Sequence, residues 1–416
     1  MPIDEAAKAS GFVKRKPKKL TGVLFVQAAI LLVAQGAVSL QRWAVLIGVL
    51  GDLTLSKQAL WERVSLRAIE FLRTCLGLVI GRNVVAGGSL PGTLKHFKRV
   101  LVQDSTLIKL CPGLAKIFPG SANHRGSKSG QLRIQAVYDL VTQQFLSFSL
   151  SSFRRNDQAA AFDILSLVGK GDLVLRDLGY FVLASLQQIA DAGAFFLSRL
   201  RSDCGLWDAT TGKPLDLLKQ LKRYGNLDCQ VLVGAQRLPC RLVAIKLDEA
   251  TAAERRRRAR FNRDKRCHPS PRDLQLLGWS LFITNVPHHQ VSAQAVARIY
   301  GLRWRIETLF KSWKSHFKIT TVPQGSAAAL QVVIYARLIF LTAFAQSCQK
   351  GWLAATEQPP AGRSLLKLAA LVADYLLVLF LEAQHQTITS AWLLQLSCQT
   401  SYDRRKRKNF QQTIMK

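Results

Sequence analysis

Residues 300–314 read YGLRWRIETLFKSWK, and this stretch restricts the fold more than any other. Its Tyr300, Arg303, Glu307 and Lys314 follow one another at offsets of three, four and seven residues. On a helix of 3.6 residues per turn, these offsets place all four side chains on one narrow face. Three charged groups are costly to bury, so this face does not suit a hydrophobic core. A carboxylate flanked by two cations and a phenol suits a metal ion bound next to a phosphate.

The segments before this stretch predict a sheet with helices packed on its faces. Residues 99–103 read as a strand that ends at Asp104, and the apolar run LVLR reads as a strand that ends at Asp177. Between them, two strands are expected to join near residues 141–142. A helix then stops at Gly193, and a further strand follows at residues 194–200. This order of strands and helices predicts an α/β fold.

Residues 201–275 interrupt this pattern. A β-hairpin is expected there, with its turn at residues 234–237, and an arginine-rich run follows at residues 254–266. The segment LGWSLFITNVP then reads as a strand that returns to the sheet, and residues 292–318 read as one long helix with Ser292 as its N-cap. Residues 325–400 are rich in Leu and Ala and are expected to be helical.

The charge of the chain indicates a polyanionic partner. The formal net charge is +32 and the pI is about 10.4, and the cations gather in runs at residues 14–19, 254–266 and 403–408. One such run is often a solvated tail or face, but three runs together favour nucleic acid, since phosphate contacts supply most non-specific affinity. An anionic membrane surface is the competing partner.

Two apolar segments require a membrane check. Residues 21–40 carry no formal charge, but Gln, Gly and Ser dilute their hydrophobicity, so a buried helix pair is expected rather than a spanning segment. Residues 328–345 carry Arg337 in their middle, which favours a core helix. The eight cysteines are scattered and form no CxxC pair, which is typical of a reducing compartment. A cytoplasmic location is therefore expected.

Three acidic residues stand out among the 26 in the chain. Asp104 and Asp177 are expected at strand ends, and Glu307 lies on the predicted helix. Mg²⁺ prefers carboxylate oxygens, waters and phosphate oxygens, and two such ions can activate an attacking oxygen and stabilise a leaving one. Taken singly, either aspartate could start a turn and Glu307 could be an ordinary surface residue, so the inference depends on the set.

This set, in its sequence context, resembles the bacterial insertion-sequence transposases of the DDE superfamily, in the group with a Tyr-x2-Arg-x3-Glu-x6-Lys signature (the insertion sequence four family). Tyr300, Arg303, Glu307 and Lys314 match the signature at every spacing. Asp104 in QDST resembles the first catalytic aspartate of the family, and Asp177 in RDLGYF resembles the second. The resemblance covers roughly residues 95–320.

The resemblance implies an RNase H-like catalytic core, interrupted by a β-rich insertion between the second aspartate and the glutamate. It implies two Mg²⁺ ions (Mn²⁺ substituting), double-stranded DNA as transposon ends and as target, and a homodimer on DNA near the bacterial nucleoid. The expected divisions are 1–95, helical and basic, for DNA-end recognition; 96–200, the first part of the core; 201–275, the basic β-rich insertion; 276–320, the rest of the core; and 321–416, a helical region with a basic tail.

The same resemblance assigns roles to individual residues. Asp104, Asp177 and Glu307 are expected as catalytic metal ligands. Tyr300, Arg303 and Lys314 are expected to contact phosphates, because an arginine grips phosphate bidentately and a lysine acts as a point charge. Trp279 and Trp304 are candidates for holding a base flipped out of the duplex, with core packing as their alternative. The arginine run adds Arg255, Arg256, Arg257 and Arg258 as candidate DNA contacts.

The function predicted from these features is cut-and-paste transposition: binding of terminal inverted repeats, cleavage at the ends, and joining to target DNA by two-metal-ion phosphoryl transfer. The alternative is a sequence-specific DNA-binding protein whose RNase H-like core no longer turns over. A basic membrane protein is a third alternative, but that function does not explain why Tyr, Arg, Glu and Lys are aligned on one face.

Overall fold

The computed structural model describes residues 1–14, 20–82, 92–122, 128–262 and 268–355, together with positions 375 and 378. The basic run at residues 403–408, most of the run at 14–19 and the end of the arginine-rich run lie outside the described residues. The helical region expected at residues 325–400 is described as far as residue 355, apart from positions 375 and 378.

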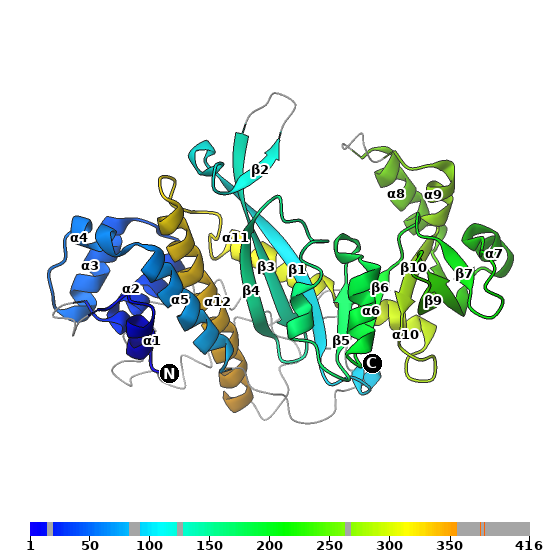
Figure 1. The fold of residues 1–416 in the computed structure, drawn as a ribbon, viewed down its shortest axis with the longest axis horizontal. Helices are drawn as coiled ribbons and strands as arrows, with labels where there is room; N and C mark the ends of the chain where they lie inside the picture. Colours follow the sequence, from blue (N-terminus) through cyan, green and yellow to red (C-terminus); the bar gives the residue numbers. More distant parts are fainter. Residues whose placement is uncertain are drawn as a thin grey trace.

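One mixed sheet of ten strands crosses the middle of the molecule (Figure 1). Its order is β2-β3-β1-β5-β6-β10-β9-β8-β7, with β4 also paired to β3. Strands β1, β5 and β6 are mutually parallel, whereas the pairs of β1 with β3 and of β3 with β4 are antiparallel. The strands span Val100–Leu110 (β1), Pro119–Ala122 (β2), Lys128–Asp139 (β3), Gln144–Ser152 (β4), Leu173–Arg176 (β5), Phe195–Arg199 (β6), Leu206–Asp208 (β7), Leu227–Val233 (β8), Leu238–Lys246 (β9) and Trp279–Thr284 (β10).

Apolar residues face both sides of this sheet, as two buried clusters show. Val100, Val102 and Ile108 of β1 belong to the larger cluster, which also holds residues of the terminal helices. Leu101, from the same strand, belongs to the second cluster, together with Val174 of β5. Successive side chains of a strand point to opposite faces, so even-numbered positions of β1 face the larger cluster and odd-numbered positions face the second.

The N-terminal part is helical, as the sequence predicts. Helices α1 (Ile3–Ala9), α2 (Gly22–Ala34), α3 (Leu40–Gly51), α4 (Lys57–Arg63) and α5 (Leu66–Ile80) pack beside α12 (Ala327–Ala355), at the left of Figure 1. Thr21 caps α2 by accepting a hydrogen bond from the amide of Leu24. Most side chains of α2 are buried, so the segment at residues 21–40 is core structure, in agreement with the prediction.

Helix α12 is long and apolar enough to cross a membrane by length and composition alone, over Ala327–Gln346. Of this apolar window, 67% is buried inside the protein, as is typical of a helix in a protein core. Arg337 is buried in its middle and donates hydrogen bonds to the backbone oxygens of Ile319 and Thr321, at 3.2 and 2.5 Å. The expectation of a core helix therefore agrees with the packing.

The other end of the sheet carries the arginine-rich segment. The predicted hairpin is present as β8 and β9, with a turn at residues 234–237. Both strands continue the main sheet through the pairing of β9 with β10. Five helices surround this half: α6 (Leu183–Asp191), α7 (Leu217–Tyr224), α8 (Glu249–Arg260), α9 (Pro271–Leu276) and α10 (Ala293–Gly301). Elsewhere and here, the described residues also form short 3-10 helices at Gly92–Leu94 (η1), Pro112–Leu114 (η2), Asp163–Ser166 (η3) and Leu178–Tyr180 (η4).

Two predicted boundaries are wrong. The strand expected to end at Asp104 continues to Leu110, because β3 pairs with it along this whole length. The helix expected over residues 292–318 is two helices, α10 and α11 (Trp304–Ser315), separated at Leu302 and Arg303. Tyr300 therefore lies on a different helix from Glu307 and Lys314, although Leu302 and Arg303 keep right-handed helical backbone angles and Arg303 lies beside both Tyr300 and Glu307.

Candidate active site

Asp104 and Asp177 lie on the same face of the sheet. The parallel register pairs Val100 with Leu173 and Val102 with Leu175, and two further residues along this register lead to Asp104 and Asp177. Asp104 is within β1, and Asp177 follows the last residue of β5 and begins η4. The alternation of side chains places both positions on the side of the larger core cluster, where helix α11 packs against β1.

Arg303 joins the two aspartates to Glu307. Its Nη1 lies 3.7 Å from Asp104 Oδ2, and its Nη2 lies 3.7 Å from Asp177 Oδ1. Nη2 also donates a hydrogen bond of 2.8 Å to Glu307 Oε1, one helical turn further along the chain. The side chains of Asp104, Glu307 and Asp177 are 16%, 28% and 40% exposed, so the cluster opens to solvent on the Asp177 side.

Burial perturbs the protonation of Asp104. Its Oδ1 accepts a 2.7 Å hydrogen bond from the amide of Ser105. The pKa of the Asp104 carboxyl is raised to about 7, mainly by removal from water and also by the charges of Asp177 and Glu307, against the lowering effects of the Ser105 amide and Arg303. Burial therefore disfavours the ionised form of Asp104.

The three carboxylates converge on a guanidinium rather than on one another. In the described part of the chain, no group of three or more His, Cys, Asp or Glu side chains is arranged to hold a metal ion by itself. The donor set nevertheless consists of carboxylate oxygens only, which are the protein ligands that Mg²⁺ and Ca²⁺ prefer. An added cation would favour the ionised form of Asp104, against the effect of burial.

The signature residues differ in exposure. Tyr300 is buried, and its ring packs 5.1 Å from that of Phe282. Lys314 is exposed and lies on the same face of α11 as Glu307, seven residues away. Trp304 is 57% exposed, so core packing does not explain it, and the Arg303 guanidinium lies 5.4 Å from its ring centroid.

Trp279 lies beside a surface cavity of about 600 Å³. Its indole Nε1 donates a hydrogen bond of 2.5 Å to the backbone oxygen of Gly225, which fixes the ring. Leu178, the neighbour of Asp177, also lines this cavity, as does the half-buried Arg199 at the end of β6. The cavity therefore lies beside the residue that follows Asp177, while Trp279 and Leu281 on its wall pack in the second core cluster, on the other face of the sheet from the aspartates. Arg199 was not predicted as a site residue, although a cation at the end of an apolar strand was a signal for it.

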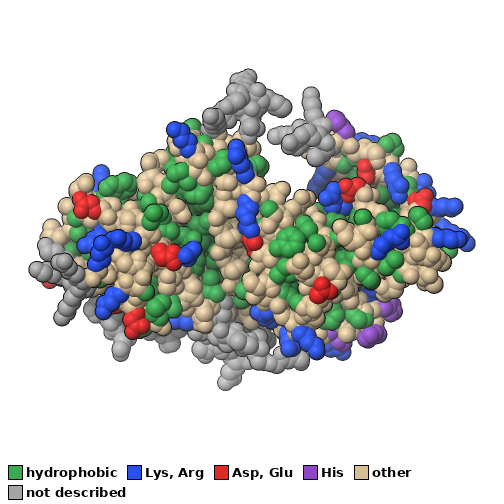
Figure 2. All heavy atoms as spheres, viewed as in Figure 1, with side chains coloured by type: hydrophobic (Ala, Val, Ile, Leu, Met, Phe, Trp, Pro, Cys, Tyr) green, Lys and Arg blue, Asp and Glu red, His purple; other side chains and the backbone are tan. Residues whose placement is uncertain are grey.

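The four consecutive arginines of α8, at residues 255–258, divide into two pairs. Arg255 donates to the backbone oxygen of Trp279 and to Ser280 Oγ, and Arg256 donates to Glu249 and to the backbone oxygen of Leu274. Arg257 and Arg258 are more exposed and share Glu254. On the face in Figure 2, Lys and Arg side chains are spread over both ends of the molecule, with Asp and Glu side chains between them.

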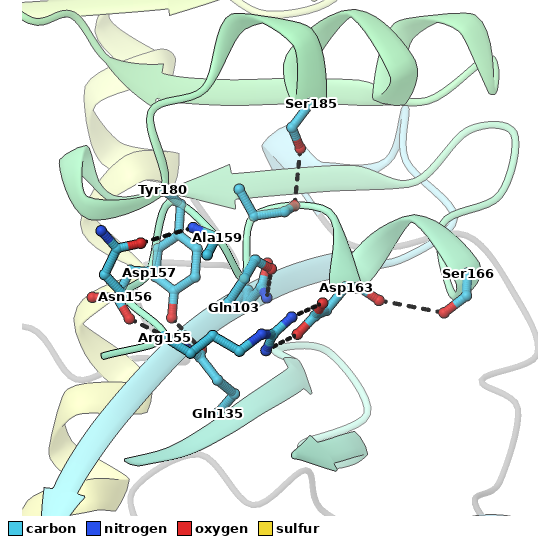
Figure 3. A network of polar contacts seen from close by, with 12 residues as sticks. Gln103, Gln135, Arg155, Asn156, Asp157, Ala159, Asp163, Ser166, Tyr180 and Ser185 are labelled. Carbon is cyan, nitrogen blue, oxygen red and sulfur yellow. Dashed lines mark hydrogen bonds and ion pairs between the residues drawn. The ribbon is translucent and has the colours of Figure 1, made fainter. Parts of the chain in front are cut away.

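Behind the acidic cluster, on the opposite face of the sheet, lies a polar layer that sequence reasoning missed. Figure 3 shows part of it, including Gln103, Gln135, Asp157 and Tyr180. Asp157 Oδ1 accepts hydrogen bonds from Ser105 Oγ, from Arg133 Nη1 and from Gln135 Nε2, at 2.8, 2.8 and 3.1 Å. The sequence contains one sign of this layer. A polar residue directly precedes each aspartate, at a strand position where the alternation of side chains predicts an apolar residue.

Comparison with known proteins shows which family the chain resembles. The family model described as "Transposase DDE domain" matches residues 95–342, which include all three acidic residues. The chain is 26% identical over 408 residues to the transposase for insertion sequence element IS231B of Bacillus thuringiensis subsp. berliner, covering 92% of this chain and 85% of that protein. It is 28% identical over 313 residues to the transposase for IS1151 of Clostridium perfringens, covering 69% and 65%.

A looser likeness is to a solved structure of the piggyBac transposase synaptic complex with hairpin DNA. Its TM-score is 0.43 at 11% identity, over 98% of this chain and 84% of that chain.

Proposed function

Because the chain belongs to the family of transposases with a DDE domain, we propose that Asp104, Asp177 and Glu307 are its catalytic carboxylates. The observation that carries this proposal is their convergence on Arg303 from β1, from the end of β5 and from α11. The protein is a DNA transposase related to those of bacterial insertion sequences. It binds the terminal inverted repeats of its element, cleaves at the ends and joins them to target DNA.

The fold proposed for the catalytic part is RNase H-like. The antiparallel strands β4, β3 and β1 followed by the parallel strands β5 and β6 support this assignment. Residues 201–275 are the basic insertion within it, residues 1–95 recognise the transposon ends, and residues 321–416 form a helical C-terminal region. The matches to the Tyr-x2-Arg-x3-Glu-x6-Lys signature support membership of the insertion sequence four family.

The metal proposed for the site is Mg²⁺, held by Asp104, Asp177 and Glu307. Two features support this fit: the all-carboxylate donor set, and the burial that raises the Asp104 pKa to about 7. When bound, the metal lowers the pKa of an attacking oxygen and stabilises the leaving oxygen. Binding of a dication favours the ionised form of Asp104, so a ligand that burial partly protonates becomes fully charged.

The chain's own cations orient the DNA. Arg303 already contacts all three carboxylates, so its guanidinium is placed to bring a phosphate to the same point by bidentate hydrogen bonds. Lys314, exposed on the Glu307 face of α11, adds a point charge for a neighbouring phosphate. Buried Tyr300 supports Arg303, whose guanidinium lies 5.8 Å from its ring. Arg303 therefore links phosphate binding to the carboxylate cluster.

The cavity beside Trp279 is proposed to take an unstacked base. Trp279 supplies a ring fixed by the Gly225 carbonyl, and Arg199 supplies a cation on the cavity wall. The exposed ring of Trp304 is a second stacking surface. The protein acts as a homodimer on two DNA ends in the cytoplasm, close to the nucleoid, and its high positive charge supports a DNA partner.

The test is cleavage of a DNA fragment that carries the element's own terminal repeats. Asp104→Asn, Asp177→Asn and Glu307→Gln are each expected to lower cleavage by at least about a hundredfold, since the metal supplies several kcal/mol of transition-state stabilisation. Binding to the ends should stay within about threefold of wild type. The matched control is Asp191→Asn, because Asp191 is an exposed acid on α6. Wild-type cleavage by any of the three variants removes that residue from the site.

A second function is tested by the same experiment. If the wild type binds the repeats but does not cleave them in Mg²⁺ or Mn²⁺, the chain is a sequence-specific DNA-binding protein with an inactive core.

A further inference from the structure

The residues that precede the two aspartates form a buried pair on the opposite face of the sheet. Gln103 lies next to Asp104 on β1, and Arg176 lies next to Asp177 at the end of β5. Arg176 Nη1 donates a hydrogen bond of 2.6 Å to Gln103 Oε1, across the boundary between the two parallel strands. Both side chains are almost completely buried. Each acidic position of the site is therefore attached, through one peptide unit, to one half of this pair.

The pair is extended by hydrogen bonds into a clasp, which we define as Gln103, Arg176 and Ser185 with the backbone oxygens of residues 160 and 161. Gln103 Nε2 donates to the oxygen of Ala160 at 2.8 Å. Arg176 Nη2 donates to the oxygen of Ala161 at 2.7 Å and to Ser185 Oγ at 3.1 Å, and that hydroxyl donates to Ala161 at 2.9 Å. Figure 3 shows the bond from Ser185. Two strands, one loop and helix α6 meet here.

Burying the clasp in the core costs free energy, because Arg176 carries a charge. In the part of the chain that the structure describes, no carboxylate lies within ion-pair distance of Arg176, and burial lowers the pKa of its guanidinium to about 10. Its charge is met by neutral oxygens and by the ring of Tyr180 at 5.8 Å. Well-packed apolar side chains commonly replace buried charged groups without loss of stability. Stability alone therefore does not account for an arginine at this position.

Geometry gives a better account. The guanidinium is a planar fork whose donors point in fixed directions, so one Arg176 nitrogen meets Gln103 while another meets the loop. These directional bonds fix how far β5 slides along β1, whereas apolar contacts tolerate small shifts. A displacement of about 1 Å between catalytic groups is enough to cost about a hundredfold in rate.

We propose that Gln103 and Arg176 are positioning residues, which hold the register of β1 and β5 and thereby set the spacing of Asp104 and Asp177 for metal binding. This proposal rests on the assignment of those aspartates to the active site. It adds to that assignment a second layer of residues, on the far face of the sheet, that touch neither DNA nor metal.

The test compares two ways of cutting the connection between the same two strands. Gln103→Leu/Arg176→Met replaces the clasp by an apolar pair. The control, Arg99→Met, removes a second arginine link, between the residues directly before β1 and β5, where Arg99 Nη2 lies 2.5 Å from Asp172 Oδ2. Each protein is measured for thermal unfolding, for end binding, for Mn²⁺ affinity by titration calorimetry without DNA, and for the Mg²⁺ concentration that gives half-maximal cleavage.

The clasp variant is expected to remain folded and to bind DNA ends as the wild type does. Its Mn²⁺ affinity should fall about tenfold and its Mg²⁺ requirement rise about tenfold, since residues that orient metal ligands commonly contribute ten- to a hundredfold. Arg99→Met should unfold at a lower temperature with unchanged Mn²⁺ affinity. A folded clasp variant with wild-type Mn²⁺ affinity and Mg²⁺ requirement overturns the proposal.

If the double variant does not fold, Arg176→Lys decides the question. Its single ammonium keeps the charge but cannot bond Gln103 and the loop with a fixed fork, so a several-fold loss of Mn²⁺ affinity is expected, and no loss in the folded protein overturns the proposal. Asp104→Asn separates this outcome from failure of the site itself. If Asp104→Asn cleaves as the wild type does, the proposed active site is refuted. If Asp104→Asn loses cleavage while the clasp variants behave as the wild type, only the proposed role of the clasp is refuted.

Discussion

Asp104 is a carboxylate that the fold keeps largely away from water, and its protonation should be visible in stability. Its native pKa of about 7 lies above the unfolded value of about 4, so the native state binds more protons between these pH values. In metal-free buffer, this residue's contribution to the free energy of unfolding therefore falls as pH rises from 4 to 7. Asp104→Asn removes this cost.

We expect Asp104→Asn to unfold at a higher temperature than the wild type at pH 8 with EDTA, by a few degrees, because roughly 1 kcal/mol shifts the midpoint by about 2–4 °C in a domain of 150–250 residues. The two proteins should converge near pH 4. Differential scanning calorimetry from pH 4 to 8 measures this, with Asp191→Asn as the control that follows the wild type. A variant less stable than the wild type at pH 8 contradicts the desolvation cost of Asp104.

In helix α8, consecutive arginines differ in the groups that they contact. Arg255 and Arg256 donate to backbone oxygens of the segment before and at the start of β10, whereas Arg257 and Arg258 share only Glu254. We expect Arg257→Gln/Arg258→Gln to weaken DNA binding and to reduce the slope of log affinity against log salt by about 2, which corresponds to two phosphates. Its thermal unfolding should match the wild type. Fluorescence anisotropy at several salt concentrations measures the slope.

The matched pair in the same helix is Arg255→Gln/Arg256→Gln, which removes the same charge. Because these guanidiniums donate to backbone oxygens at partly buried positions, this variant should lose stability, by about 0.5–1.5 kcal/mol for each hydrogen bond removed. Equal stability losses in the two double variants contradict the division of the helix into an inner and an outer pair.

Helix α12 connects distant parts of the chain. It packs against α2 and α5, although some 250 residues separate it from α5 in the sequence. Arg337 binds the oxygens of Ile319 and Thr321, so it connects this helix to the segment that follows α11. We expect Arg337→Met to leave these oxygens unpaired and to lower the free energy of unfolding by about 1–3 kcal/mol for each. Chemical denaturation measures the loss, with Arg298→Met on α10 as a control in which little change is expected.

A membrane role for α12 makes the opposite prediction. Replacing the arginine in a spanning helix would favour insertion, since a charge at the centre of a bilayer is costly. An Arg337→Met variant that moves into the membrane fraction would therefore contradict the assignment of α12 to the core.

Features that depend on neighbours in the chain were readable from the sequence alone. Asp177 directly follows an apolar strand, and Gly193, with φ of +71°, ends α6 as predicted. The hairpin turn at residues 234–237 and the bond between Arg303 and Glu307, four residues apart, follow from local backbone geometry. The family motif was equally legible, because it is a pattern of residue types at fixed spacings.

Features that depend on distant segments required the tertiary structure. β1 runs through Asp104 because β3 pairs with it there, and the helix expected over residues 292–318 divides at Leu302 and Arg303, which places Arg303 among three carboxylates. The bond between Gln103 and Arg176, 73 residues apart, has no local signature. Spacing along the chain determines which side chains share a turn or a strand, whereas packing between strands and helices decides which faces meet and where a helix must break.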